Sequence, residues 1–252
     1  MNIQWDAGKY AQDFAFVPKY GEALLELLDR ETVHTVLDLG CGGGALTEQL
    51  MQAGYAVCGM DADASQLKLA RQRCPNVRFF QGDATDFSLE TPVDAVFSNA
   101  VLHWIDRERQ PDALRCISRA LRAGGQFVFE MGGAGCGAQI HSALRCAFEG
   151  RGFAYHMPFY FPTIGEYAPL LEQAGLRVTY ATLFDRPTPL KGEQGMEGWI
   201  KMFVKEPFAA IPTAQAEEII REAVEALRPS LYQNGVWTAD YVRLRCKAEK
   251  QV

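Results

Sequence analysis

The sequence lacks the features of several broad protein classes. No apolar run among its 252 residues reaches the roughly 18 residues that a membrane-spanning helix needs. The segment Met1–Asp6 has neither the basic start nor the apolar stretch of a signal peptide. None of the seven cysteines forms a Cys-x-x-Cys pair and their number is odd, which favours neither a zinc site nor a disulfide framework. We therefore expect no membrane partner, no metal ion, and a location in the reducing cytoplasm.

Positive charge is also scarce. Lys and Arg number 25 against 31 Asp and Glu, the formal net charge is -6, and only four histidines are present. An acidic chain repels phosphate backbones, so nucleic acid is not expected as a partner. Hydrophobic residues at 48% and charged residues at 22% are ordinary for a globular protein and exclude a disordered chain. A small molecule is the expected partner, and no pattern in the sequence sets the oligomeric state.

Strand and helix patterns alternate between about residues 33 and 130. Short apolar runs that stop at glycine or turn residues predict buried strands, and apolar residues at helical spacing predict helices. We expect strands at 35–39, 55–60, 77–80, 93–98 and 126–130, and helices at 44–53, at 64–73 and from Pro111 to the glycines 124 and 125. Such alternation is typical of parallel βαβ units.

The second half is organised differently. Residues 132–160 are rich in glycine and aromatic residues and predict an irregular segment with one helix. Thr163 and Glu166 form a capping-box pattern that opens a helix ended by Gly175. A strand is expected at 176–183, helices at 191–230 as far as Pro229, and a last strand at 236–246. A helical insertion between two late strands is typical of a functional cap.

The segment Asp38–Gly44, Asp-Leu-Gly-Cys-Gly-Gly-Gly, ends the first strand and opens the first helix. Glycines let a ligand approach the backbone, and a helix N-terminus offers free N–H groups. Gly40, Gly42 and Ala45 also fit the dinucleotide pattern G-x-G-x-x-[GA], so NAD is a competing ligand. Asp38 argues against NAD, because a carboxylate here repels a pyrophosphate and suits the ammonium group of a methionine.

Two later strand ends also favour S-adenosylmethionine over NAD. The segment 81–85 follows the third strand and contains Asp83, a carboxylate placed to meet an adenine amine. The segment 98–104 follows the fourth strand, at the carboxyl edge where ligands bind in such sheets. Asp61 ends the second strand, where an acid holds ribose hydroxyls in either ligand class.

These motifs resemble the class I S-adenosylmethionine-dependent methyltransferases, whose glycine motif is D/E-x-G-x-G-x-G. Asp38, Gly40, Gly42 and Gly44 match it fully, and the resemblance covers about residues 33–130. Three further stretches resemble the bacterial trans-aconitate methyltransferase type: Trp5–Phe16, Asn99-Ala100 with Trp104, and the capped C-terminal half. Leu102–Ile105 also resembles juvenile hormone acid methyltransferase, another enzyme that methylates a carboxylic acid.

The resemblance implies an α/β fold of the Rossmann-like class I methyltransferase type. A seven-stranded, mostly parallel sheet is expected in the order 3-2-1-4-5-7-6, with the last strand antiparallel, helices on both faces and a helical cap. The expected parts are N-terminal lid helices at 1–30, a cofactor-binding core at 31–131, and a segment 132–252 that completes the sheet and inserts cap helices at about 132–160 and 191–235.

The resemblance also implies a site for S-adenosyl-L-methionine, with S-adenosyl-L-homocysteine as product. Within the motif that runs from Asp38 to Gly44, the resemblance places Gly40 and Gly42 along the methionine and ribose of the cofactor. It places Asp61 on the ribose hydroxyls and Asn99 near the methionine. Ala62 is expected beside the adenine ring, and Asp83 and Ala84 are expected to face adenine. A solvated helix cap remains the alternative for Asp61, and a turn-forming aspartate the alternative for Asp83.

His103 is the one histidine at the expected active edge. It is a candidate catalytic residue, either as base for a hydroxyl acceptor or as hydrogen-bond donor to a carboxylate. Packing against Trp104 is the alternative for its role. Trp104 itself is a candidate substrate contact, and by resemblance Tyr10 and Phe16 belong to a lid near the reacting centre.

Substrate contacts in the second half are harder to select. Tyr160 and Trp199 either line an apolar substrate pocket or serve ordinary packing. Six cations are candidate anchors for an acidic substrate, and their spacing selects none of them: Arg151, Arg186, Lys191, Lys201, Lys205 and Arg243.

The expected function is methylation of a small molecule at oxygen, on a carboxylate or hydroxyl. An N- or C-methyltransferase, an NAD-dependent oxidoreductase and a non-catalytic S-adenosylmethionine-binding protein remain the alternatives. A carboxylate needs only orientation and partial desolvation, whereas an alcohol, a phenol or an ammonium group must first lose a proton.

Overall fold

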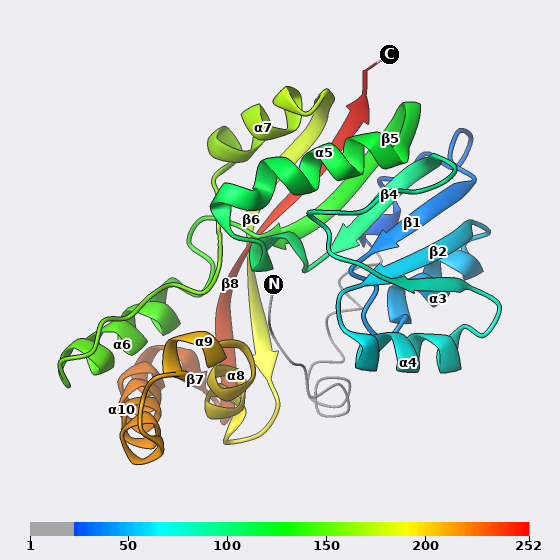
Figure 1. Cartoon of the computed structure of the whole chain (residues 1–252). Coiled ribbons are helices and arrows are strands. Elements are labelled where there is room, and N and C mark those ends of the chain that lie inside the picture. Colours follow the sequence, from blue (N-terminus) through cyan, green and yellow to red (C-terminus); the bar gives the residue numbers. More distant parts are fainter. Residues whose placement is uncertain (1–22, 252) are drawn as a thin grey trace. The chain divides into compact units, whose positions relative to one another are not determined.

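The computed structural model describes residues 23–251, and its first half alternates strands with helices as expected (Figure 1). In chain order the elements are β1 (Thr35–Leu39), α3 (Ala45–Gln52), β2 (Ala56–Asp61), α4 (Ala64–Arg73), β3 (Arg78–Gln81), β4 (Val93–Asn99), the short 3-10 helices η1 (Leu102–Trp104) and η2 (Arg107–Arg109), α5 (Gln110–Ala120) and β5 (Leu121–Gly132). The second half contains α6 (Ala138–Glu149), α7 (Ile164–Gln173), β6 (Leu176–Leu190), α8 (Gly195–Phe203), α9 (Lys205–Phe208), α10 (Thr213–Leu231), β7 (Tyr232–Gln233) and β8 (Val236–Lys250).

The strands form one sheet in the order β3-β2-β1-β4-β5-β8-β6, and the two-residue β7 pairs with β8 off this path. Apart from β7, which was not predicted, this is the expected order. The pairs from β3 to β5 are all parallel. Lys250 Nζ donates to the carbonyl of Leu121 at 2.7 Å, and Arg245 pairs with Glu130 at 2.8 Å. The end of β8 therefore lies beside the start of β5, so these two strands run antiparallel.

Two hydrophobic cores cover the two faces of the sheet, because alternate residues of a strand point to opposite faces. In β4, Ala95 and Phe97 pack with Leu50 of α3, whereas Val96 packs with Leu114 of α5. Helix α7 joins the α5 side through Tyr167 and Leu171, both about 1% exposed. The central strands are thus buried on both sides, and their polar ends mark the edge where a ligand can bind.

The boundary between α5 and β5 differs from the sequence-based expectation. The helix ends at Ala120 rather than at the glycines, and β5 already begins at Leu121. Gly124 has a φ of 70°, and a Cβ on Gly125 would lie 2.9 Å from the carbonyl oxygen of Arg122. The two glycines serve a register shift between β4 and β5 at Val93, not a helix end.

The expected stop at Pro229 was also wrong by two residues. Helix α10 continues to Leu231 with Pro229 inside its last turn. A proline removes one backbone donor there, and the helix continues past it; Ser230 Oγ donates to the carbonyl of Leu227 at 3.3 Å.

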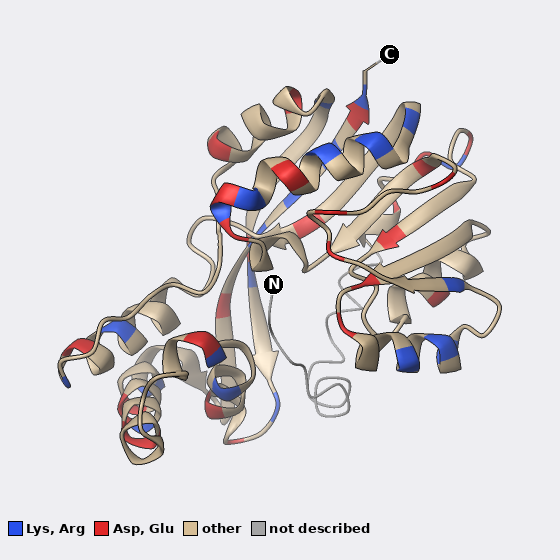
Figure 2. Ribbon diagram, in the orientation of Figure 1, with Lys and Arg blue, Asp and Glu red and all other residues tan. Residues whose placement is uncertain are grey.

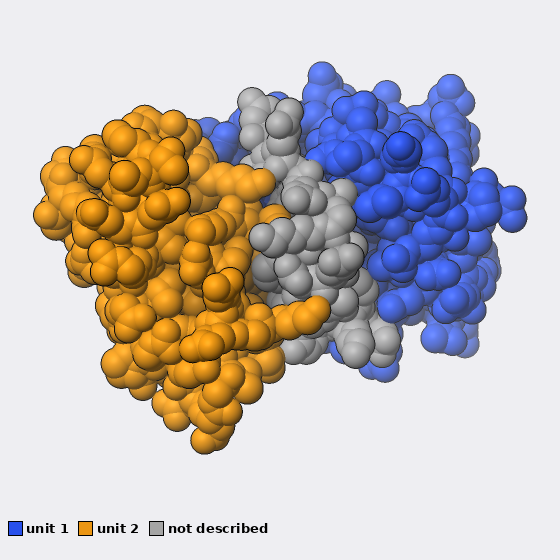
Figure 3. Space-filling model, turned by 90° about the horizontal axis from the view of Figure 1, so that it is seen from below, with its two compact units in different colours: residues 1–133, 160–183, 244–252 blue, residues 134–159, 184–243 orange. Residues whose placement is uncertain are grey.

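The chain divides into two compact units, coloured separately in Figure 3. The first comprises residues 1–133, 160–183 and 244–252, and the second comprises 134–159 and 184–243. In the second unit, charged residues recur along α10 (Figure 2), and Arg151 after α6 pairs with Glu218 and Glu222 of that helix. Ile219, Ala223 and Leu227 form the buried side of α10 that its apolar spacing predicted.

Candidate functional site

The glycine turn between β1 and α3 has a backbone shape that residues with side chains rarely adopt. Gly40, Gly42 and Gly44 have φ values of 73°, 51° and 80°. Gly40 donates its N–H to the carbonyl of Met60 at 2.7 Å, which fixes the turn to the end of β2. A Cβ on Gly40 would lie 2.2 Å from Cγ2 of Val101, so the loop after β4 packs directly against the turn.

The turn is open at Gly42 and closed at Gly44. Among the described residues, the nearest atom to a Cβ on Gly42 would be Oε1 of Gln66, 3.8 Å away, so in this part of the chain the backbone is left open to a ligand. A Cβ on Gly44 would lie 3.1 Å from Cα of Ala70 in α4, and Gly44 is also the N-cap residue of α3. The same motif thus contributes close helix packing and an exposed backbone.

Asp38 places a carboxylate inside the fold just before this turn. It is 2% exposed, and its Oδ2 accepts a hydrogen bond of 2.5 Å from Thr47 Oγ1. Burial raises the pKa of Asp38 to about 7; the hydrogen bond from Thr47 lowers it, and the neighbouring carboxylate of Asp61 raises it further. A cationic group bound here would favour the ionised carboxylate.

Asp61, at the end of β2, connects the second strand to the glycine turn. Its Oδ2 accepts the N–H of Gly42 at 2.8 Å and its Oδ1 accepts the N–H of Asp63 at 2.9 Å. Burial raises the pKa of Asp61, and these backbone hydrogen bonds oppose the shift. Each carboxylate oxygen has a second lone pair, so Asp61 retains acceptor capacity for hydroxyl groups. Ala62, half-buried, accepts a hydrogen bond from Gln81 Nε2 at 2.9 Å.

Asp83 lies in a tight local network after β3. Its Oδ1 accepts from the N–H and the hydroxyl of Thr85, at 2.8 and 2.7 Å, and its Oδ2 lies 3.5 Å from Nη1 of Arg109. Burial raises the pKa of Asp83, but the bonds from Thr85 and the charge of Arg109 outweigh it, so the net pKa is lowered. Ala84 is buried in the hydrophobic core on the α5 side of the sheet. The side chain of Asp83 therefore has the local contacts of a turn-forming aspartate.

The loop after β4 is strained at one position. Asn99 ends the strand, half-buried, and Ala100 has a φ of 61°, which is unusual for a residue with a Cβ. The N–H of Ala100 donates to the carbonyl of Glu130 at 2.8 Å, which holds this backbone against the end of β5. Strained backbone fixed in this way is common at functional sites.

His103 follows in η1 and is 7% exposed. Its Nδ1 accepts the backbone N–H of Gly132, the last residue of β5, at 3.2 Å. Its ring lies 5.5 Å from Trp104 and 5.8 Å from Phe161, and its carbonyl accepts the N–H of Tyr160 at 3.0 Å. The structure thus brings His103, Trp104 and Tyr160 together at the carboxyl ends of β4 and β5.

Three further candidate residues were selected from the sequence: Tyr10, Phe16 and Trp199. Trp199 belongs to the second unit, where its Nε1 donates to the hydroxyl of Tyr241 and its ring is 6.0 Å from His141. Tyr10 and Phe16 lie outside the described residues.

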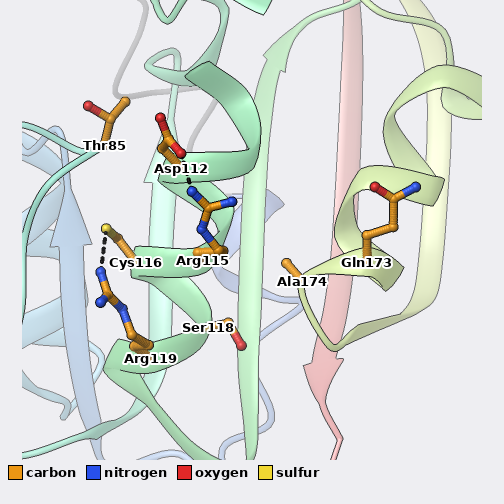
Figure 4. Close-up of a pocket in the computed structure, with 8 residues that line it drawn as sticks. All are labelled: Thr85, Asp112, Arg115, Cys116, Ser118, Arg119, Gln173 and Ala174. Atoms are coloured by element: carbon orange, nitrogen blue, oxygen red, sulfur yellow. Dashed lines mark hydrogen bonds and ion pairs between the residues drawn. The ribbon is translucent and has the colours of Figure 1, made fainter. Parts of the chain in front are cut away.

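A separate pocket in the first unit lies beside α5 and the end of α7 (Figure 4). It has a volume of about 410 Å³ and is lined by Thr85, by residues of α5 and by the end of α7. Arg115 pairs with Asp112 there, and Arg119 contacts the sulfur of Cys116 at 3.1 Å. Since these groups already pair with one another and neither Gly42 nor His103 lines it, this pocket is not the candidate site.

Comparison with known proteins decides the family. Residues 36–125 match a family model described as a methyltransferase domain. An uncharacterized methyltransferase of Schizosaccharomyces pombe, C70.08c, is 32% identical over 260 residues, 98% of each chain. A trans-aconitate 2-methyltransferase of Mycolicibacterium gilvum is 32% identical over 216 residues, 81% of this chain and 82% of its own. The chain belongs to the class I S-adenosylmethionine-dependent methyltransferases.

The fold of a solved methyltransferase agrees with this assignment. Phosphoethanolamine N-methyltransferase 2 of Haemonchus contortus, in complex with phosphomonomethylethanolamine and S-adenosylhomocysteine, matches with a TM-score of 0.58 and 18% identity, over 93% of this chain and 53% of its own. The methyltransferase expectation and its cofactor, S-adenosylmethionine, are therefore confirmed, and the NAD alternative was wrong.

The site of this methyltransferase fits its cofactor. The open backbone at Gly42 leaves room for a ligand, and the buried carboxylate of Asp38 suits an ammonium group. Asp61 offers acceptors for hydroxyl groups. The carboxylate of Asp38 beside the turn does not suit the pyrophosphate of a dinucleotide.

Sequence reasoning missed three residues that shape this methyltransferase site. Thr47, Val101 and Arg109 hold Asp38, Gly40 and Asp83 in place. Only Thr47 had a usable signal, a hydroxyl in the first turn of the helix that follows the motif. Within residues 23–251, no helix is long and apolar enough to cross a membrane, and no three His, Cys, Asp or Glu side chains are grouped as metal ligands would be.

Proposed function

We propose that this methyltransferase methylates a carboxylate oxygen of a small organic acid. When bound, S-adenosylmethionine supplies a methyl group activated by its positively charged sulfur. The transfer forms a bond between the carboxylate oxygen and the methyl carbon and breaks the bond from that carbon to sulfur. The electron pair of the broken bond stays on sulfur, the two charges cancel, and no proton moves.

The hydrogen bond from the N–H of Gly132 to Nδ1 of His103 is the observation that carries the proposal. A ring nitrogen that accepts a hydrogen bond from a backbone N–H carries no proton. Since Nδ1 accepts from Gly132, the neutral ring holds its proton on Nε2. His103 then offers a donor and cannot take a proton at Nε2.

A donor suits a carboxylate and not an alcohol or an ammonium group. A carboxylate is already a nucleophile and needs to be held in line, which a hydrogen bond from Nε2 does to one of its two oxygens. An alcohol or an ammonium group must lose a proton to a base, and the Nε2–H tautomer does not provide one. The side chains of Trp104 and Phe161 beside His103 would exclude water from the reacting group.

The cofactor would be held by the residues at the edge of β1 and β2. Asp38 would pair with the ammonium group, Asp61 would accept from the ribose hydroxyls, and the backbone at Gly40 and Gly42 would line the methionine and ribose. Ala62, Asp83, Ala84 and Asn99 would complete the site as the family resemblance implies. Because the carboxylate of Asp83 already accepts a hydrogen bond from Thr85, Asp83 would shape the turn beside adenine rather than offer a free carboxylate to it.

Relatives and composition support the proposal. The similar enzyme of Mycolicibacterium gilvum is named for trans-aconitate, an organic acid. All seven cysteines are free thiols, and five of them are buried, which fits the reducing cytoplasm where small acids are metabolised.

Variants of His103 test the proposal. His103→Gln keeps an amide donor near the position of Nε2 and has no basic nitrogen, whereas His103→Ala removes the donor. For an acid acceptor, we expect His103→Gln to retain activity within about tenfold and His103→Ala to lose about 100-fold in kcat, the size of one charge-assisted hydrogen bond.

The outcome distinguishes the two roles of His103. If both variants lose activity equally and wild-type kcat rises with pH as a histidine titrates, His103 is a base and the acceptor is a hydroxyl or an amine. Binding of S-adenosylhomocysteine by each variant is the control for an intact cofactor site.

A further inference from the structure

The pocket between Thr85, α5 and the end of α7 has the size of a small-molecule site (Figure 4). Its volume of about 410 Å³ lies in the range of known ligand pockets, and all of its lining residues belong to the first unit. Neither the glycine turn nor His103 lines it, so it is separate from the site of methyl transfer. The pocket is therefore a candidate site for a second ligand.

Packing and a buried hydrogen bond fix the walls of this pocket. Leu114 and Ile117 of α5 and Leu171 of α7 belong to one hydrophobic core. The hydroxyl of Tyr167 in α7 donates to Oε1 of Gln110 in α5 at 2.9 Å, and both residues are buried. The walls are thus in place before a ligand binds, so little binding free energy is lost in ordering them.

Two guanidinium groups line the pocket, and one of them has no acidic partner in the described chain. Asp112, Arg115 and Arg119 follow one another at spacings of three and four on α5, so they share one side of the helix. Arg115 pairs with Asp112. Within residues 23–251, Arg119 forms no ion pair, and its Nη2 donates only to Sγ of Cys116 at 3.1 Å, a weak acceptor. Two guanidinium groups against one carboxylate leave the lining with a net positive charge.

Unused hydrogen-bond donors lie near Arg119. Ser118 and Gln173 line the pocket from α5 and from the end of α7, and in the part of the chain that the structure describes neither side chain has a hydrogen-bond partner. A Cβ on Gly175 would lie 4.0 Å from Oγ of Ser118, so this hydroxyl is on the side of α5 that meets the end of α7. The hydroxyl of Thr85, in contrast, is already used in the turn after β3.

This set of donors suits a phosphate group better than a carboxylate. The planar fork of a guanidinium binds two oxygens of either anion. A carboxylate then has no oxygen left, whereas a phosphate monoester has a third terminal oxygen that a hydroxyl or an amide N–H can bind. A phosphate ion alone would fill only a small part of the pocket, and the remaining volume suits the organic part of an ester.

We propose that the pocket binds a small phosphate monoester, with its phosphate group on Arg119. Ser118 and Gln173 donate to the phosphate oxygen that the guanidinium leaves open. The ester binds whether or not the cofactor is present, and its binding is independent of the methyl acceptor and of the proposed function.

Ribose 5-phosphate, ribose and inorganic phosphate are matched probes, because they separate the contribution of the phosphate group from that of the sugar. Binding of each to the full chain is measured by calorimetry with saturating S-adenosylhomocysteine, so that the cofactor site is occupied. We expect ribose 5-phosphate to bind the wild-type protein at least about tenfold more tightly than ribose or inorganic phosphate. Arg119→Gln should weaken ribose 5-phosphate about tenfold, and Arg119→Lys, which keeps the charge without the fork, should weaken it less.

Asp112→Asn should have the opposite effect on affinity. The substitution removes the carboxylate that pairs with Arg115 and repels an anion in the pocket. Ribose 5-phosphate should therefore bind about threefold to fivefold more tightly. A purely structural role of these side chains in α5 would not increase the affinity, and weaker binding by Asp112→Asn contradicts the proposal.

Arg78→Gln is the control, because it removes the same charge from an exposed position at the start of β3. It should leave the affinity for ribose 5-phosphate unchanged. Thermal melts show that the variants fold, and ribose 5-phosphate should raise the melting temperature of the wild type more than that of Arg119→Gln.

Three results overturn the proposal. The first is unchanged binding of ribose 5-phosphate by a folded Arg119→Gln protein. The second is a wild-type protein that binds ribose as tightly as ribose 5-phosphate, or that binds neither at concentrations up to about 10 mM. The third is equal affinity for inorganic phosphate and ribose 5-phosphate, because the pocket would then bind the free ion only.

Discussion

Thr47 and Asp38 form a hydrogen bond of 2.5 Å between a buried hydroxyl and a buried carboxylate, directly beneath the glycine turn. The bond lowers the pKa of Asp38, but burial outweighs it and leaves the pKa at about 7. The charge of a residue proposed to bind the cofactor therefore changes near neutral pH, which has consequences for stability and for binding.

The stability of the ligand-free protein should depend on the titration of Asp38. The folded pKa of about 7 lies above the ordinary aspartate pKa of 3.8, so between these pH values the folded protein holds a proton that the unfolded chain has released. This contribution to stability is present in full below pH 4 and is lost as pH rises through 7, on the order of 4 kcal/mol at the limit. Asp38→Asn should remove this part of the pH dependence, measured by urea unfolding between pH 5 and pH 8.

Cofactor affinity should show the opposite dependence. An ammonium group binds ionised Asp38 better, so affinity for S-adenosylhomocysteine should rise as pH increases from 6 to 8. Thr47→Val removes the bond that lowers the pKa of Asp38 and should move this rise to higher pH. Calorimetric titration at several pH values measures both. An affinity that stays flat in the wild type and in Thr47→Val would mean that Asp38 does not meet a cation.

Gly40→Ala should destabilise the fold through a single contact. The added Cβ would lie 2.2 Å from Val101, at a residue with a φ of 73°, and we expect a loss of about 2 to 4 kcal/mol. Gly54→Ala is the control, because its φ is 97° but no atom of residues 23–251 would lie within 4 Å of the added Cβ; the expected loss is about 1 to 2 kcal/mol. Val101→Ala should rescue much of the difference in a double-mutant cycle. Equal losses at Gly40 and Gly54 would show that the contact with Val101 does not matter.

Asp61→Ala should weaken cofactor binding without unfolding the protein. The substitution removes the acceptor proposed for the ribose hydroxyls and the bond to the N–H of Gly42. We expect a loss of affinity for S-adenosylmethionine of about 10- to 100-fold, with a native circular dichroism spectrum. Asp63→Ala is the comparison, since it removes the N-cap of α4 and no proposed cofactor contact. An equal loss of affinity in Asp63→Ala would assign the effect to the structure around the start of α4 rather than to a ribose contact of Asp61.

Local signals made most of the first half predictable. Glycines end β1, Pro75 follows α4, and the motif Asp38–Gly44 joins strand to helix, so each element could be read from a few neighbouring residues. The end of α5 could not, because Gly124 and Gly125 serve a register shift against β4, a partner about 30 residues away.

The chemistry of the site depends on contacts between distant segments. The tautomer of His103 is set by the N–H of Gly132, 29 positions later, which no spacing rule would suggest. In the second unit, the guanidinium of Arg243 lies over the ring of Tyr241, with Cζ 4.5 Å from the ring centroid. From the sequence, Arg243 was one of six equivalent cations.

Transfer of a labelled methyl group tests the central claim most directly. The purified protein is incubated with methyl-deuterated S-adenosylmethionine and a metabolite extract, and products are identified by mass spectrometry before and after mild base. The account predicts a labelled organic acid whose label is lost in base, as for a methyl ester. A labelled product that keeps its label in base would place the methyl group on nitrogen, carbon or an ether oxygen and contradict carboxylate methylation.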